Sequence, residues 1–126
     1  MTGATLLQVA LGGAIGSVGR YLSGVAMTSL LGRGFPWGTI FVNILGSFLM
    51  GVLIVVLAKK GGAPFAPFFQ IGLLGGFTTF SSFSLDALTL YERGQAELAM
   101  AYVAGSLILS LGAIALAFWL MRSLLA

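Results

Sequence analysis

The sequence GGFTTFSSFS at residues 75–84 lies within an apolar segment that is long enough to cross a membrane. Its two glycines loosen a helical backbone, and hydroxyl side chains follow between phenylalanines at positions 77, 80 and 83. Inside lipid, an unwound turn persists only where protein or water satisfies its freed backbone groups. The run therefore predicts a broken membrane helix whose interruption serves a function.

The composition predicts an integral membrane protein. The chain has 126 residues, of which 59% are hydrophobic and 7% are charged, whereas soluble domains carry about 25% charged residues. A soluble protein of this size could not bury so much apolar surface. Cysteine and histidine are both missing from the sequence, and no nucleophile–base pair or cluster of metal ligands occurs, so we do not expect an enzyme.

We expect a single all-α domain, residues 1–126, with four transmembrane helices. The first is interpreted as a retained helix and not a signal peptide, because no basic n-region or clear cleavage site precedes it. The third would be longer than the bilayer core if it were continuous, which fits an unwound middle near the midplane. The predicted helices cover residues 4–31, 38–58, 67–92 with a break at 75–79, and 95–124.

Two of these helices carry polar stripes. Thr39, Asn43 and Ser47 lie four residues apart on the second helix, and a similar stripe on the fourth helix consists of Tyr102, Ser106 and Ser110. Interhelical hydrogen bonding explains Ser47 well enough. Asn43 is different, because an amide at the midplane needs several partners and its NH₂ group can donate to an anion.

The first helix contains one charge, Arg20, and a Gly12-x-x-x-Gly16 pattern that favours close helix contact. A membrane-embedded arginine costs about 2.5–3.5 kcal/mol at a helix centre and usually faces protein or water. Two interpretations of Arg20 stay open: a structural or snorkelling role, and the lining of an aqueous vestibule that attracts anions.

The positive charges do not favour one orientation in the membrane. Lys59, Lys60 and Arg122 lie on the side of the N-terminus, against Arg33, Arg93 and, if it snorkels that way, Arg20 on the other side. A difference this small does not fix the topology by the positive-inside rule. We therefore expect insertion in both orientations and pairing with an inverted copy, as an antiparallel, dual-topology homodimer.

The broken helix offers ligands for ions of both signs. Freed backbone carbonyls are hard oxygen ligands for a small cation. Phe80 and Phe83 share a helix face, and the edge of an aromatic ring is positive, so a small anion can rest against the rings. Ordinary packing is the commoner explanation of a phenylalanine pair, but the surrounding glycines and hydroxyls favour a binding site.

These residues together resemble the Fluc/CrcB family of fluoride channels. The decamer at 75–84 carries most of the resemblance. Supporting matches are Gly12-Gly13 with Gly16 and Arg20, Trp37-Gly38-Thr39 with Asn43, Glu92-Arg93-Gly94, and Tyr102-x₃-Ser106-x₃-Ser110. The similarity covers nearly the whole chain in the same order.

The resemblance implies a fluoride-selective passive channel that exports toxic cytoplasmic fluoride across a bacterial inner membrane. It implies an antiparallel homodimer with two pores and a structural Na⁺ between the subunits, held by the backbone carbonyls of Gly75 and Thr78. By the same matching, the residues expected along the fluoride pore are Phe80, Phe83, Asn43, Ser81, Ser82, Tyr102, Ser106 and Ser110. Ser82 and Asp86 stand where the family usually has Thr and Glu, and no role is carried over to Asp86.

Two other classes compete with this interpretation. A small multidrug-resistance type exporter is also a four-helix, dual-topology dimer, but it needs a carboxylate in the first helix, where this chain has only Arg20. A non-transporting assembly subunit would use the small-residue faces for packing alone. It would leave Asn43 and the hydroxyl residues without a purpose.

Overall fold

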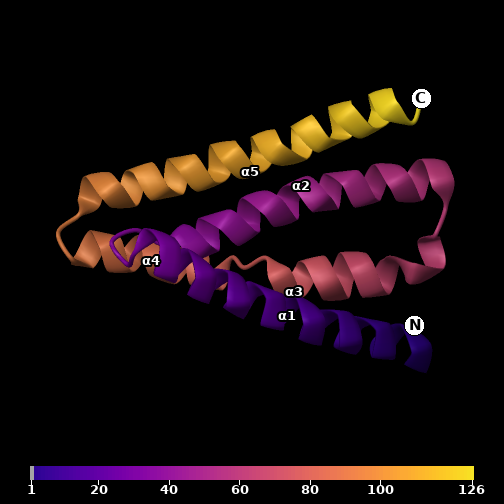
Figure 1. Ribbon diagram of the computed structural model, residues 1–126, viewed down its shortest axis with the longest axis horizontal. Helices are drawn as coiled ribbons and strands as arrows, with labels where there is room; N and C mark the ends of the chain where they lie inside the picture. The colour runs from indigo at the N-terminus through magenta and orange to yellow at the C-terminus, as the bar shows by residue number, and fades with distance from the viewer. Residues whose placement is uncertain (1) are drawn as a thin grey trace.

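The computed structural model describes residues 2–126, and every regular element in that range is helical. The three long helices are α1 (Gly3–Leu31), α2 (Trp37–Lys60) and α5 (Ala96–Leu124) (Figure 1). Their ends lie within two residues of the predicted ranges 4–31, 38–58 and 95–124. The all-helical fold class is confirmed.

The remaining segment is built from short pieces. A 3₁₀ turn, η1 (Ala63–Phe65), leads into a π-helix, η2 (Pro67–Leu74), which continues into the single turn α3 (Gly75–Phe77). Residues 78–80 then interrupt the helix, with Thr78 extended at ψ 160°, before α4 (Ser81–Glu92) begins. We call residues 78–80 the break.

The predicted start of the break at residue 75 is wrong. Gly75 and Gly76 remain helical, and the small size of Gly76 serves packing. A Cβ atom added to Gly76 would lie 2.8 Å from the carbonyl oxygen of Gly13 in α1. The close approach of α1 therefore explains Gly76, whereas a Cβ atom at Gly75 would meet only the carbonyl oxygen of Gln70, at 3.7 Å.

Glycines on both partners allow α1 to lie directly against η2. A Cβ atom added to Gly12 or Gly16 would overlap a backbone oxygen of η2, and one added to Gly72 would lie 2.9 Å from the oxygen of Val9. Small residues let helix backbones approach in this way. The close contact predicted for Gly12 and Gly16 is confirmed.

The start of η2 is tied to α1 by one amide side chain. Gln8 donates from Nε2 to the carbonyl of Pro64 at 3.1 Å, and its Oε1 accepts from the N–H of Phe68 at 3.2 Å. One side chain therefore satisfies backbone groups where a helix start leaves them unpaired. This fixes one end of the segment that leads to the break.

Both termini and the turn around η1 lie at one end of the molecule, and the loops at residues 32–36 and 93–95 lie at the other (Figure 1). We call the latter the loop end. α2 packs mainly against α5, whereas α1 packs mainly against η2 and α3. Gly32 and Gly94 have φ values of 84° and 80°, a conformation that suits glycine, where α1 and α4 give way to their loops.

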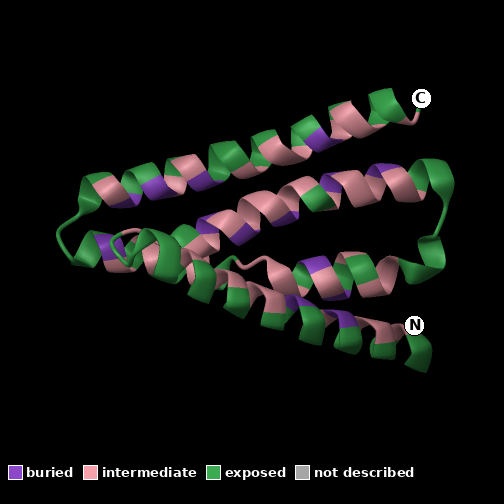
Figure 2. Ribbon diagram, viewed as in Figure 1, coloured by how far each residue is buried: buried purple, intermediate pink, exposed green. Residues whose placement is uncertain are grey.

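The outer surface is apolar, as lipid or another subunit requires. Large side chains such as Leu30, Ile108 and Trp119 are exposed, and exposed residues run along the outward sides of α1 and α5 (Figure 2). Among the described residues, α2 and α5 are long and apolar enough to cross a membrane, with mean hydropathies of 2.7 and 2.2. The chain is a membrane protein, and its exposed apolar side chains are expected for one.

Candidate functional site

The break is held open by Asn43 of α2. Its Nδ2 donates to the carbonyl of Thr79 at 2.9 Å, and its Oδ1 accepts from the N–H of the same residue at 2.8 Å. The amide thus pairs with Thr79 as a neighbouring strand would. Because the amide nitrogen has two hydrogens, one donor of Asn43 is left over.

This pairing changes the hydrogen bonding of the carbonyls around the break. In a continuous helix, the N–H of Thr79 would donate to Gly75 and that of Ser82 would donate to Thr78. Here Thr79 donates to Asn43, and Ser82 donates to the hydroxyl of Thr79 at 3.1 Å. The carbonyls of Gly75 and Thr78 therefore lose their helical donors.

Arg20 satisfies another carbonyl of this region. Its Nε donates to the oxygen of Gly76 at 3.1 Å, at the end of α3. The same residue also lines a cavity that opens at the loop end. Arg20 thus makes a structural bond and also lines a cavity, so the geometry accommodates both interpretations of this residue.

A surface cavity of about 440 Å³, the break cavity, lies beside the break on the face of α2, α4 and α5. The phenylalanine pair lies on one side, with ring centroids 5.7 Å apart, and Phe80 is 76% exposed. The cavity brings together seven of the predicted site residues: Asn43, Gly75, Thr78, Phe80, Phe83, Ser106 and Ser110.

Two serines that line the break cavity have buried hydroxyl groups without a partner. The Oγ atoms of Ser106 and Ser110 are inaccessible to solvent and make no hydrogen bond within the part of the chain that the structure describes. Leaving a buried polar group unpaired costs about 1–3 kcal/mol. The two hydroxyls are therefore donors that the fold itself does not use.

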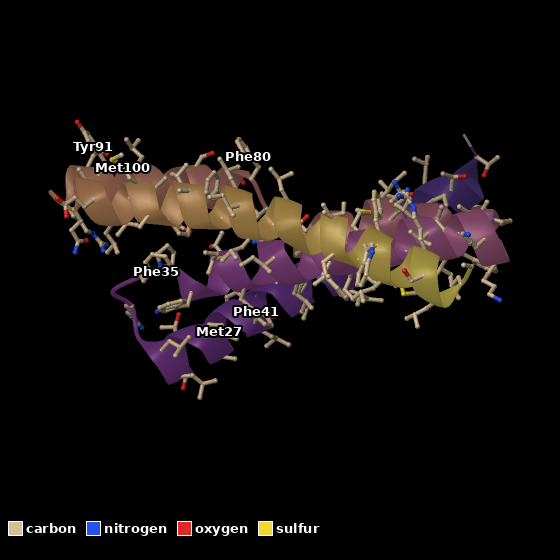
Figure 3. All side chains as sticks on the ribbon, turned by 90° about the horizontal axis from the view of Figure 1, so that it is seen from above. Met27, Phe35, Phe41, Phe80, Tyr91 and Met100 are labelled. Carbon is tan, nitrogen blue, oxygen red and sulfur yellow. The ribbon has the colours of Figure 1, made fainter. Side chains whose placement is uncertain are left out.

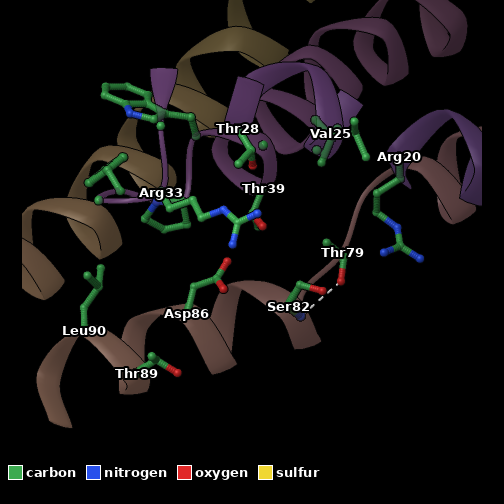
Figure 4. A pocket seen from close by; sticks show the side chains of 18 of the residues that line it. Arg20, Val25, Thr28, Arg33, Thr39, Thr79, Ser82, Asp86, Thr89 and Leu90 are labelled. Atoms are coloured by element: carbon green, nitrogen blue, oxygen red, sulfur yellow. Dashed lines mark hydrogen bonds between the residues drawn. The ribbon is translucent and has the colours of Figure 1, made fainter. Parts of the chain in front are cut away.

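A second cavity, of about 730 Å³, opens at the loop end (Figure 4). It is lined by Arg20, Ser82 and Asp86 together with Arg33 of the loop, whose side chain is directed toward Asp86. Thr79 lines this loop-end cavity and the break cavity alike. The residue that Asn43 holds therefore lies between the two cavities.

Two predicted site residues line neither cavity. Tyr102 is fully buried, donates its hydroxyl to Asp86 at 3.1 Å and packs its ring against Phe83 at 5.4 Å between centroids. Ser81 is exposed at the start of α4, with its hydroxyl 3.4 Å from that of Thr79. Their parts in an ion path stay predictions.

Sequence reasoning gave no role to Asp86 or to Phe35. Asp86 accepts the hydroxyl of Tyr102, a contact across α4 and α5 that spacing within one helix does not indicate. Phe35 precedes a proline in the loop between α1 and α2. Its ring packs against Trp37 and Tyr102.

The chain resembles known proteins over nearly its whole length. Residues 7–118 match the family described as CrcB-like protein, Camphor Resistance (CrcB). A protein of Cereibacter sphaeroides named fluoride-specific ion channel FluC is 65% identical over 107 residues, covering 85% of this chain and 86% of the relative. A protein of the same name from Paracoccus denitrificans is 51% identical over 125 residues, covering 97% and 98%.

Proposed function

The chain belongs to the CrcB family, and we propose that it is a fluoride-specific ion channel that conducts fluoride passively across a membrane. Its relatives are named as channels, not as enzymes. The family relationship gives the ion, and the geometry of the break cavity supports where the ion passes.

The observation that carries the proposal is the pair of unpartnered hydroxyls on α5. Ser106 and Ser110 line the same cavity as Phe80, Phe83 and Asn43. Fluoride is a small, strongly hydrated anion, so a pore must replace its water with other donors. The hydroxyls, the spare amide hydrogen of Asn43 and the positive ring edges are groups of that kind.

The path that we propose runs between the two cavities past Thr79. At the loop end, Arg20 and Arg33 place positive charge at the cavity and would raise the local concentration of anions. Beyond Thr79, the ion would meet the phenylalanine pair and the hydroxyls. Ser81, Ser82 and Tyr102 would flank this path, as the family resemblance implies.

The residues at the break also fit a sodium ion. The carbonyls of Gly75 and Thr78, which the resemblance implies as ligands, are among those that lose helical donors at the break. Unwound carbonyls of this kind suit Na⁺. A bound Na⁺ would supply positive charge that holds these carbonyls, and with them two subunits, in place.

We further propose an antiparallel homodimer with two pores and four spans per subunit, in a bacterial inner membrane. Phe80 is 76% exposed on one subunit, and a partner would complete the wall of the break cavity. The balanced positive charges support insertion in both orientations.

The test is fluoride efflux from liposomes that contain the purified protein, measured with a fluoride electrode while a potassium ionophore balances charge. We expect rapid fluoride efflux and strong rejection of chloride, with Phe80→Ile and Phe83→Ile impaired. Proton-coupled export of a cationic drug without fluoride efflux would instead favour the multidrug-resistance type exporter.

A further inference from the structure

Five aromatic rings pack in sequence from the loop end to the break cavity. Successive ring centroids are 4.6, 5.4, 5.4 and 5.7 Å apart. We call this set the aromatic chain, and its members in order are Trp37, Phe35, Tyr102, Phe83 and Phe80. The last two line the break cavity, so unbroken ring contacts join the loop at residues 32–36 to that cavity.

Tyr102 is the central member and is held at three places. Its exposed fraction is 0%, its hydroxyl is bound to Asp86, and its ring lies against Phe83 at an interplanar angle of 40°. Phe35 meets the ring edge-on at 86°. Asp86 and Phe83 both belong to α4, so Phe35 is the ring contact that a different part of the chain supplies.

Phe35 itself is anchored by its surroundings. It is partly buried against the cluster of Ile40, Leu90, Ala99 and Tyr102, and its other face meets Trp37 (Figure 3 labels Phe35 at the loop end and Phe80 farther along the molecule). Protein interiors are close-packed, and a void removes contacts from the atoms that line it. Loss of this ring would leave Tyr102 unsupported on the side of the loop.

We propose that Phe35 is a positioning residue for fluoride conduction, acting through Tyr102 on the orientation of Phe83. This rests on the proposed function of the break cavity. Phe35 also lines the loop-end cavity, but the ring contacts that link it to the pore wall at Phe83 run through Tyr102. The aromatic chain explains why Phe35, in the loop after α1, is packed inward, whereas Phe65 of η1 is exposed.

The experiment compares Phe35→Ala, Phe35→Leu and Phe35→Tyr with a matched control, Phe65→Ala, at the opposite end of the molecule. Fluoride efflux from liposomes and the preference for fluoride over chloride are measured for each. We expect Phe35→Ala to conduct roughly threefold to tenfold more slowly, the effect of losing one aromatic pair. Phe35→Tyr keeps the ring and should restore conduction, whereas Phe65→Ala should match the unmodified protein.

A second readout follows Phe83 without relying on flux. 4-Fluorophenylalanine is placed at position 83, and its ¹⁹F resonance is recorded in detergent. Phe35→Ala should shift this resonance and Phe65→Ala should not. If Phe35→Ala does not assemble, Phe35→Leu, which fills space without a ring, takes its place in both measurements.

The outcomes separate this inference from the proposed function. An unchanged resonance of position 83 in Phe35→Ala would overturn the inference, whether efflux is normal or is slowed through the loop-end cavity that Phe35 lines, and would leave the channel function intact. Equal losses in Phe35→Ala and Phe35→Tyr would also overturn it, because the ring would then not be the cause. An unmodified protein without fluoride efflux would overturn the proposed function itself, whatever the resonance of position 83 shows.

Discussion

Replacing Asn43 with alanine should remove the two hydrogen bonds that hold the backbone of Thr79 at the break, and it should stop fluoride conduction. The side chain makes two bonds to the backbone of Thr79, at 2.9 and 2.8 Å. Its loss leaves one N–H and one carbonyl of a partly buried residue without these partners; a fully buried group would cost about 1–3 kcal/mol, and water from the two cavities lowers the cost here. We expect a lower unfolding temperature in detergent.

The freed N–H of Thr79 also has an alternative partner. It can donate to the carbonyl of Gly75, as in a continuous helix, which would recover part of the lost stability. That bond would use a carbonyl that we assign to Na⁺, so conduction should fall even where stability partly recovers. Asn43→Asp keeps an oxygen for the N–H of Thr79 but turns a second oxygen toward its carbonyl, and it should conduct no better than Asn43→Ala.

The measurements are thermal unfolding and liposome efflux of fluoride, with Ser47→Ala as the control for stability. Ser47 lies one turn along the same face of α2 and lines the same cavity. Unchanged unfolding and unchanged efflux in Asn43→Ala would refute the assignment of Asn43 as the residue that holds the break open.

Three further outcomes are expected. Gly16→Ala should destabilise the protein by about 1–3 kcal/mol, because its Cβ atom would overlap the oxygen of Leu73; Gly13→Ala, which has open space, should be neutral or slightly stabilising in thermal unfolding. Ser106→Ala and Ser110→Ala remove unpartnered hydroxyls, so they should slow fluoride efflux without lowering the unfolding temperature. If efflux and the unfolding temperature both fall, the hydroxyls serve the fold. Replacing Na⁺ with N-methylglucamine throughout purification and assay should abolish efflux and lower the unfolding temperature, and unchanged efflux would remove Na⁺ from the proposal.

The long helices could be predicted from the sequence because their causes are local. Apolar runs of sufficient length, bounded by glycine at positions such as Gly32 and Gly61, fix α1 and α2 to within two residues. The small-residue face at Gly12 and Gly16 was also visible, since its four-residue spacing follows from helix geometry.

The exact position of the break could not be predicted, because glycine in a membrane helix can either allow unwinding or allow close helix packing. Gly75 and Gly76 suggest unwinding on conformational grounds, but both are helical, and the nearness of Gly13 makes Gly76 a packing residue. The break forms three residues later because Asn43 pairs with the backbone of Thr79 across 36 positions of sequence. A contact at that separation leaves no periodic signal.

The contacts of Phe35 and Asp86 were hidden for the same reason. Both residues contact Tyr102, which belongs to a different helix from Asp86 and lies far along the chain from Phe35. The stripe of Tyr102, Ser106 and Ser110 was correctly grouped on one helix, but only the two serines line the break cavity. Spacing therefore identified the helix face. It did not show that Ser106 and Ser110 line the cavity while Tyr102 packs behind its wall.

The cation and anion sites that we propose are coupled through one peptide unit. The N–H of Thr79 donates to Asn43 when the break is open, and in a continuous helix it would donate to Gly75. A ligand that binds the carbonyls of Gly75 and Thr78 keeps them from accepting helical hydrogen bonds. It therefore also favours the pairing of Thr79 with Asn43 beside the phenylalanines. An ion that binds only when the helix is interrupted at the break stabilises that conformation. By linkage, it also stabilises every other site that the interruption creates. Na⁺ bound at the break would thus support the fluoride path without touching fluoride, and its removal should affect conduction and stability together.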